Sequence, residues 1–269
     1  MQEKLDELRR IVGGMESLAV GFSGGVDSTF LLKVACDCLG DRALGVTVLS
    51  EVIPAHEADE AVRLARQIGA RHEIIRLSVM GSDAFTRNPP DRCYHCKKAV
   101  FGRICELAGG RGVRFTADGA NADDQSDHRP GARAIAELGV RSPLLEAGFT
   151  KADIRRHSKA LGLPTHDRPS FACLASRIPY GTPITREALE MVDAAEQCLR
   201  DEGFRQYRVR WHGPVARIEL PPEDLPRAAE EALRNRLVSR LRQIGFTWVA
   251  LDLQGFRSGS LNEALDLPE

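Results

Sequence analysis

A glycine-rich segment near the start of the chain has the residue types of a phosphate-binding loop. It reads SGGVDS after an apolar run over residues 17–22, and its positions are Ser23, Gly24, Gly25, Val26, Asp27 and Ser28. Paired glycines let the backbone bring N–H groups close to a ligand, serine hydroxyls add donors, and a following helix favours an anion. The segment lacks both the Gly-Lys-Ser/Thr ending of a Walker A loop and the Gly-x-Gly-x-x-Gly pattern. The sequence therefore predicts a phosphate loop of another kind, and the alternative is a strand–helix turn built from small residues.

Three of the seven cysteines lie in segments that could bind a metal centre. Cys93 and Cys96 are spaced Cys-x-x-Cys in RCYHCK, and Cys173 lies in PSFACLASR. Structural zinc sites use four protein ligands, and the chain has no second Cys-x-x-Cys pair. Three thiolates without a fourth ligand suit an iron–sulfur cluster with one open iron, and zinc or a redox pair are the alternatives. The other four cysteines are expected to be small buried residues of helices: Cys36, Cys38, Cys105 and Cys198.

The elements that must position these residues alternate between apolar runs and helical patterns. A buried strand is expected at 17–22, further strands at 43–49, 72–77 and 113–117, and helices at 27–39 and 55–68. Continuous apolar strands separated by helices are typical of a parallel sheet covered on both faces. We therefore predict an α/β fold, a doubly wound parallel-sheet domain over residues 1–165.

A different pattern follows this domain. A Pro-, Gly- and Ser-rich stretch over residues 166–184 is interpreted as an active-site loop or linker that carries Cys173. Beyond it, helices are expected at 185–203 and 223–244, and strands at 207–212, 215–220 and 247–253. This order predicts a smaller C-terminal α+β domain over residues 185–269.

The first strand of this domain carries a row of basic residues. Arg208, Arg210 and His212 alternate with Tyr207, Val209 and Trp211. Because successive side chains of a strand point to opposite faces, the three basic residues are expected to share one face.

The composition is that of a globular protein and excludes several classes of function. Lys and Arg total 37 against 38 Asp and Glu, so the chain lacks the basic footprint of a dedicated nucleic-acid binder. No apolar run approaches the roughly 18 residues of a membrane span, and the first residues have the spacing of an amphipathic helix, not of a signal peptide. An odd number of cysteines without the dense spacing of a secreted scaffold predicts reduced thiols and a cytoplasmic protein.

The motifs taken together resemble one family. SGGVDS, RCYHCK and PSFACLASRIPYGTPIT are similar to the LarE branch of the PP-loop ATP pyrophosphatases, and RVRWHGPVARIE and LDLQGFRSGSLN extend the resemblance over nearly the whole chain. SGGVDS is specific only to the superfamily, which includes NAD synthetases and tRNA thiolases, whereas the segment around Cys173 narrows the resemblance to this branch. The resemblance implies an adenine nucleotide alpha hydrolase-like fold and an ATP-dependent sulfurtransferase that forms AMP and pyrophosphate.

The resemblance also implies a substrate and the residues that bind it. The SGGVDS loop would hold the pyrophosphate of ATP with Mg²⁺, and Gly119 in the segment DGAN would border the same crevice. The substrate would be pyridinium-3,5-biscarboxylic acid mononucleotide, whose carboxylates become the thiocarboxylates of the nickel-pincer nucleotide, the lactate racemase cofactor. Its phosphate would be bound by Ser176, Arg177, Arg208 and Arg210, because arginine forks match phosphate oxygens. The alternative for the arginine strand is an ordinary solvated face.

Cys173 is the expected catalytic residue, and the resemblance leaves two sulfur chemistries open. Some members of the branch use the single cysteine at this position as a sacrificial sulfur donor, and others carry three cysteines and bind a 4Fe–4S cluster. This chain has all three, so Cys93, Cys96 and Cys173 are expected to ligate a cluster that delivers the sulfur. We expect a small-molecule mononucleotide as partner, no nucleic acid, no membrane, and a homo-oligomer.

Other interpretations remain open from the sequence. A tRNA thiolase shares the loop and a three-cysteine cluster, although the near-neutral charge disfavours RNA, and a non-catalytic module that binds an adenine nucleotide would need only the loop. A solvated helix face is expected for Glu187, Glu190 and Glu196, with a metal contact of Glu196 as the alternative. A polar loop is favoured over a metal site for the cluster Asp123, Asp124, Asp127 and His128.

Overall fold

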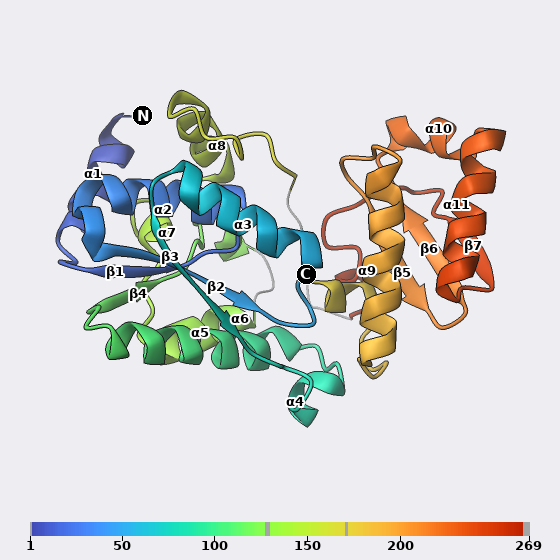
Figure 1. Cartoon of the computed structure of the whole chain (residues 1–269), viewed down its shortest axis with the longest axis horizontal. Coiled ribbons are helices and arrows are strands. Elements are labelled where there is room, and N and C mark those ends of the chain that lie inside the picture. Colours follow the sequence, from blue (N-terminus) through green and yellow to red (C-terminus); the bar gives the residue numbers. More distant parts are fainter. Residues whose placement is uncertain (1, 127–129, 170–171, 266–269) are drawn as a thin grey trace. The chain divides into compact units, whose positions relative to one another are not determined.

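The computed structural model describes residues 2–126, 130–169 and 172–265 (Figure 1). The chain divides into two compact units, Met1–Val79 with Asp91–Phe171, and Met80–Pro90 with Ala172–Glu269. The second unit contains the residues of the expected C-terminal domain and also a short segment from the first half of the chain. Within the described ranges, no helix is long and apolar enough to cross a membrane.

The first unit is built on a parallel sheet of four strands, which confirms the predicted α/β class. β1 (Leu18–Gly21), β2 (Ala43–Leu49), β3 (Arg71–Arg76) and β4 (Phe115–Ala117) pair in the order β3-β2-β1-β4. Leu18 on β1 is the register partner of Ala43 on one side and of Phe115 on the other. The strand order therefore reverses between β1 and β4, and ligands of open α/β sheets bind past the carboxyl ends of the strands at such a point.

Helices cover both faces of this sheet (Figure 1). The core on one face is shared by α1 (Gln2–Gly13), α2 (Val26–Leu39), α3 (Ala55–Gln67), α7 (Pro143–Glu146) and α8 (Lys151–Ala160). The core on the other face is shared by α5 (Arg92–Gly110) and α6 (Gly131–Glu137). Strand β1 contributes to both, since Leu18 and Val20 belong to the first core and Ala19 to the second.

Strand β3, which was expected at 72–77, is less buried than the other strands of the sheet. It forms the edge of the sheet, and the side chain of Ile74 at its centre is 43% exposed. An edge strand has a neighbour on one side only, so its apolar residues are covered less completely than those of β1.

The second unit contains a mixed sheet of three strands. β5 (Arg208–His212) pairs antiparallel with β6 (Val215–Glu219), and β6 pairs parallel with β7 (Trp248–Leu251). The helices of this unit are α4 (Asp83–Thr86), α9 (Arg186–Asp201), α10 (Leu225–Ala229) and α11 (Glu231–Ile244). Buried Val209 and Ile218 are register partners on one face of the sheet, so Arg208 and Arg210 lie on the opposite face, as the alternation predicted.

The single helix expected at 223–244 is wrong in its first part. A 3₁₀ turn, Pro222–Asp224, leads into α10, and the extended backbone of Glu230 (ψ 133°) separates α10 from α11. Pro222 and Pro226 have no N–H to donate, so this stretch supports only short helical pieces. The apolar spacing that suggested one helix belongs to α11, which buries Leu233, Leu237 and Leu241.

Candidate active site

The phosphate loop lies between β1 and α2, at the reversal point of the sheet. Gly24 has a φ of +72°, a conformation that favours glycine, and Gly25 is the N-cap of α2 without a side-chain capping bond. The two serine hydroxyls close the loop, with Ser23 Oγ 3.1 Å from Ser28 Oγ, and Ser28 Oγ donates to the Gly25 carbonyl at 3.3 Å. The first N–H groups of α2 thus open onto the loop, the arrangement in which helices bind phosphate.

Asp27 lies in the first turn of α2, and its two carboxylate oxygens have different surroundings. Oδ2 accepts a hydrogen bond from the ammonium of Lys151, the first residue of α8, whereas Oδ1 is buried without a partner among the described residues. Burial raises the pKa of Asp27, and the charge of Lys151 opposes this shift. A buried, unsatisfied carboxylate oxygen beside a phosphate loop fits the hard oxygen ligands that Mg²⁺ prefers.

Gly119 follows β4 and packs directly against the loop. A Cβ at this position would lie 3.2 Å from the backbone nitrogen of Ser28 and 3.3 Å from Cβ of Asp27. A side chain at residue 119 would therefore displace the start of α2. The preceding Asp118 is buried and accepts a hydrogen bond from the Ser142 hydroxyl at 2.7 Å, which holds this end of β4 in place.

The first two cysteines of the expected cluster lie at the start of α5. Cys93 and Cys96 are half-buried cysteines outside any disulfide and lie one helical turn apart, so their side chains are neighbours on one side of the helix. Cys173 belongs to the second unit and is also a half-buried free thiol. Among the described residues, no group of three or more His, Cys, Asp and Glu side chains is gathered as a metal site. Partly accessible cysteines outside disulfides are nevertheless the donor type that a 4Fe–4S cluster requires.

The backbone of Cys173 is held by several hydrogen bonds. Its carbonyl accepts from the backbone N–H of Ser176 at 3.0 Å, from the Ser176 hydroxyl at 2.7 Å and from Nη1 of Arg177 at 3.1 Å. Arg177 is buried and forms a two-pronged ion pair with Glu196 of α9, at 2.7 and 2.9 Å. The solvated face expected for Glu196 is therefore wrong, because this carboxylate neutralises a buried arginine, whereas Glu187 and Glu190 are exposed as expected.

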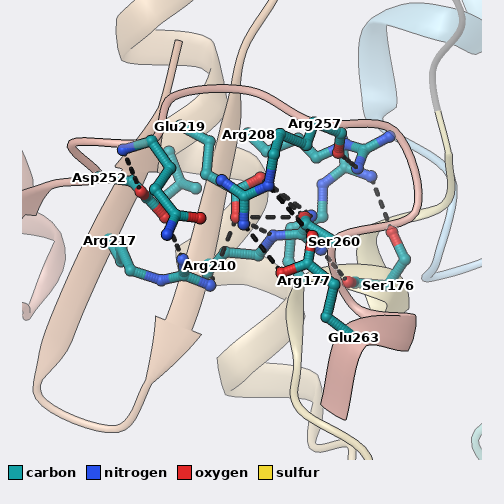
Figure 2. Close-up of polar contacts among 12 residues, drawn as sticks. Ser176, Arg177, Arg208, Arg210, Arg217, Glu219, Asp252, Arg257, Ser260 and Glu263 are labelled. Carbon is teal, nitrogen blue, oxygen red and sulfur yellow. Dashed lines mark hydrogen bonds and ion pairs between the residues drawn. The ribbon is translucent and has the colours of Figure 1, made fainter. Parts of the chain in front are cut away.

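Arg210 forms a second buried pair, with Glu219 on the adjacent strand (Figure 2). Both contacts are 2.9 Å long, and both residues are almost fully buried. The same guanidinium donates to the carbonyl of Ser176 at 2.6 Å and to the hydroxyl of Ser260 at 2.7 Å. Arg210 thus connects the Cys173 loop, the sheet and the C-terminal segment.

Arg208 differs from the other arginines around it in having no carboxylate partner among the described residues. Four others have a carboxylate within ion-pair distance: Arg177, Arg210, Arg217 and Arg257. Within the described part of the chain, Arg208 has none: it stacks 4.5 Å from the ring of Phe256 and makes a long hydrogen bond, 3.4 Å, to the carbonyl of Arg257. Burial, and then the charges of Arg210 and Arg177, lower the pKa of Arg208 to about 10. An anionic ligand would stabilise this guanidinium.

Within each unit, the structure brings predicted residues together. Gly119 and the SGGVDS loop adjoin in the first unit, and the four residues expected to bind the substrate phosphate form one network in the second: Ser176, Arg177, Arg208 and Arg210. Sequence reasoning missed Lys151 and Glu219. The capping box of Thr150 and Asp153 could have shown that Lys151 starts a helix. The place of Glu219 opposite Arg208 in the hairpin could have suggested an ion pair with the arginine strand.

The acidic segment after β4 contacts residues beside the phosphate loop, and, in addition to burial, the charge of Asp124 contributes to raising the pKa of Asp27. Asp123 is exposed and accepts a hydrogen bond from the backbone N–H of Lys151 at 2.8 Å, and Asp124 is half-buried and accepts from the backbone N–H of Asn121 at 3.1 Å. Asp127 and His128 lie outside the described residues.

Comparisons with known proteins agree with this geometry. The family model described as NAD synthase matches residues 2–91. Pyridinium-3,5-bisthiocarboxylic acid mononucleotide synthase of Lactiplantibacillus plantarum is 40% identical over 253 residues, which cover 93% of this chain and 91% of that protein. An uncharacterized protein of Synechocystis sp. is 41% identical over 265 residues, or 98% of this chain and 99% of that protein. The NH(3)-dependent NAD(+) synthetase of Aeropyrum pernix is 34% identical over a shorter stretch of 67 residues, which covers 24% of this chain and 23% of that protein. The chain therefore belongs to the LarE family of PP-loop proteins.

Proposed function

We propose that this chain is an ATP-dependent sulfur transferase that acts on pyridinium-3,5-biscarboxylic acid mononucleotide. The name of the L. plantarum relative supports the substrate, and the phosphate loop of the first unit supports the use of ATP. In the proposed reaction each carboxylate becomes a thiocarboxylate, and one ATP is converted to AMP and pyrophosphate for each sulfur transferred. Seven cysteines outside disulfides fit a reducing compartment, so we place the activity in the cytoplasm.

The first step would activate the carboxylate. A carboxylate oxygen attacks the α-phosphorus of ATP and the bond from this phosphorus to the β-phosphate oxygen breaks, so that pyrophosphate leaves and an acyl adenylate forms. The Ser23 and Ser28 hydroxyls and the first N–H groups of α2 would hold the leaving pyrophosphate, where negative charge develops. Oδ1 of Asp27, which has no hydrogen-bond partner in the described part of the chain, would ligate Mg²⁺, and the ion would neutralise charge on the phosphates when bound.

The strongest support for recognition of the substrate phosphate is the guanidinium of Arg208, which has no carboxylate within ion-pair distance among the described residues. Its neighbours Arg177 and Arg210 are already neutralised by Glu196 and Glu219, so the excess positive charge of the network is on Arg208. A mononucleotide phosphate would neutralise this charge and so stabilise the protonated guanidinium, which burial disfavours. Ser176 and the paired arginines would frame this anion site from the sides.

The second step would transfer sulfur to the activated carbon. Sulfur at the oxidation level of sulfide attacks the acyl carbon, the bond from this carbon to the AMP oxygen breaks, and AMP departs to leave a thiocarboxylate. Cys173 is the proposed catalytic residue, because its backbone is fixed by Ser176 and Arg177 beside the proposed phosphate site. A 4Fe–4S cluster ligated by Cys93, Cys96 and Cys173 would supply the transferable sulfur when bound.

Release of pyrophosphate tests the proposal. Purified chain, ATP and Mg²⁺ are incubated with and without the mononucleotide, and pyrophosphate, AMP and the substrate mass are measured. We expect release that depends on the mononucleotide, together with replacement of carboxylate oxygen by sulfur. The corresponding nucleoside, which lacks the phosphate, should react only at a much higher KM. Equal reactivity of nucleotide and nucleoside would contradict the role of Arg208, and absence of pyrophosphate release would contradict the proposed activity.

A further inference from the structure

The phosphate loop contains one peptide that is held by a residue outside the loop as well as by the loop itself. This peptide joins Gly24 to Gly25, and two consecutive glycines leave its neighbouring torsions unusually free. Because a peptide unit is planar and trans, the carbonyl of Gly24 and the N–H of Gly25 point in opposite directions. The N–H of Gly25 faces the interior of the loop, where Ser23 Oγ accepts it at 3.3 Å. A rotation of this peptide would replace an N–H donor in the anion site by a carbonyl oxygen.

Arg168 holds the opposite end of this peptide. Its Nη1 donates to the carbonyl of Gly24 at 3.1 Å, and its Nη2 lies 2.9 Å from a carboxylate oxygen of Glu60 on α3. The side chain of Arg168 is only 14% exposed, although it extends from a segment without regular structure. The guanidinium therefore has one fixed carboxylate on one side and the loop carbonyl on the other.

The segment that carries Arg168 is itself fixed to the first unit. Arg155 of α8 donates to the carbonyl of His166 at 3.0 Å and to the carbonyl of Arg168 at 2.7 Å. Arg168 is thus held through its backbone as well as through Glu60. Arg168 precedes Cys173 by five positions in the sequence.

We propose that Arg168 is a positioning residue for ATP: it prevents rotation of the Gly24–Gly25 peptide and keeps the Gly25 N–H directed at the pyrophosphate portion of the nucleotide. The inference rests on the proposed binding of ATP by this loop. It assigns Arg168 no contact with ATP, since the residue acts through the carbonyl on the outer side of the loop. A long guanidinium fork suits this role because it spans from Glu60 to the carbonyl with two separate N–H groups.

The chain offers a matched control for this proposal. Arg63 also pairs with Glu60, at 3.1 Å, but it is 65% exposed and makes no contact with the loop among the interactions of the described residues. Arg168→Ala and Arg63→Ala therefore remove an arginine from the same carboxylate, and only the first releases the glycine carbonyl. Arg168→Lys keeps a cation but has no fork.

The test is calorimetric titration of the full chain with Mg²⁺–ATP and separately with pyrophosphate, together with hydrogen exchange of the Gly25 amide by NMR. We expect Arg168→Ala to weaken both ligands about tenfold, the effect of one charge-assisted hydrogen bond, and to speed exchange at Gly25. Arg168→Lys should lie between it and wild type, Arg63→Ala should match wild type, and guanidinium ion at millimolar concentration should partly restore binding to Arg168→Ala. Wild-type affinity and exchange in Arg168→Ala would overturn the proposal. A wild-type chain that binds neither ligand would overturn the assignment of the loop itself, and the role of Arg168 with it.

Discussion

Glu219 lies directly opposite Arg208 in the register of β5 and β6, but both of its carboxylate oxygens bind Arg210. The diagonal pairing leaves the cross-strand neighbour without a counter-ion among the described residues. Ser260 reinforces it, because its hydroxyl lies 2.7 Å from Arg210 and 3.4 Å from Glu219 (Figure 2). The two arginines of one strand thus have different roles, one inside the fold and one available to an anion.

The first prediction concerns the available arginine. Arg208→Ala should raise the KM for the mononucleotide about 10- to 100-fold, because a hydrogen bond to a charged group contributes about 1.5–3 kcal/mol. The KM for ATP and the melting temperature should change little, since Arg208 has no carboxylate that the substitution would strand. Steady-state kinetics with each substrate varied in turn measures both constants.

Arg236→Ala is the control for this experiment. Arg236 belongs to the same unit, but it pairs with Glu202 on the surface at 2.8 Å. It should leave both constants at their wild-type values. Parallel loss of ATP and mononucleotide binding in Arg208→Ala would contradict the assignment and indicate damage to the fold.

The second prediction concerns the buried arginine. Arg210→Ala leaves the carboxylate of Glu219 buried and without its main partner, which should cost about 3–5 kcal/mol of the free energy of unfolding. The double substitution Arg210→Met with Glu219→Leu removes both charges and should recover most of that loss. Urea unfolding monitored by circular dichroism measures the difference. A single variant as stable as wild type would show that the pair does not support the fold.

A third prediction concerns Asp27 and Ser28 in the phosphate loop. Asp27→Ala or Ser28→Ala should reduce adenylate formation about 100- to 1,000-fold, because the loss of one preorganised group at a developing charge typically costs about 2.7–4 kcal/mol of activation free energy. The fold should persist, since the core contacts of α2 come from residues such as Phe30 and Leu31. Pyrophosphate release under saturating substrate gives the rate, and an unchanged rate in either variant would contradict the assignment of this loop.

A fourth prediction uses the acid dependence of stability at Asp153. Hydrogen bonds, the largest from the ammonium of Lys4, hold the pKa of this carboxyl well below its usual value of 3.8. Asp153 stays charged to a lower pH in the folded chain than in the unfolded chain, so its contribution is fully present above the unfolded pKa and is lost as the pH falls below it. Asp153→Asn should therefore have a lower melting temperature than wild type at pH 7. The gap should narrow below about pH 4, where unfolded aspartate begins to protonate.

Asp37→Asn serves as the comparison for that measurement. Asp37 forms an exposed pair with Lys33 on the surface of α2. Pairs of this kind contribute little, so its substitution should change the melting temperature only slightly at either pH. A gap for Asp153→Asn that stays constant from neutral to acid pH would contradict the assigned role of the charge.

The elements that hold the site could be read from the sequence because their signals are local. Apolar runs predicted the strands of the parallel sheet, and the period of two placed Arg208 and Arg210 on one face of β5. The same alternation treats these two arginines alike. Among the described residues only Arg210 is paired, because Glu219 of the next strand and Ser260 of the C-terminal segment both bind it. No local sequence pattern specifies which of two neighbouring arginines a carboxylate binds.

Contacts between distant segments could not be predicted from the sequence for the same reason. Lys151 reaches Asp27 across 124 positions of the chain, and Arg168 reaches Gly24 across 144. Both contacts follow from how α8 and the segment after it pack against α2 and α3. The segment Met80–Pro90 is a further case, because its place in the second unit is set by contacts such as the hydrogen bond from Asn88 to the carbonyl of Pro179 at 2.7 Å.

The most direct measurement of the central claim is the intact mass of the chain and of the substrate after reaction under anaerobic conditions, with reconstituted wild type compared with Cys93→Ala and Cys96→Ala. The account predicts a thiocarboxylate product that exceeds the amount of protein when sulfide is supplied, a Cys173 that keeps its full mass, and strong loss of product in both variants. Stoichiometric conversion of Cys173 to dehydroalanine, with both variants fully active, would contradict the three-cysteine assignment and leave sulfur transfer itself in place. Absence of any sulfur in the product would contradict the account as a whole.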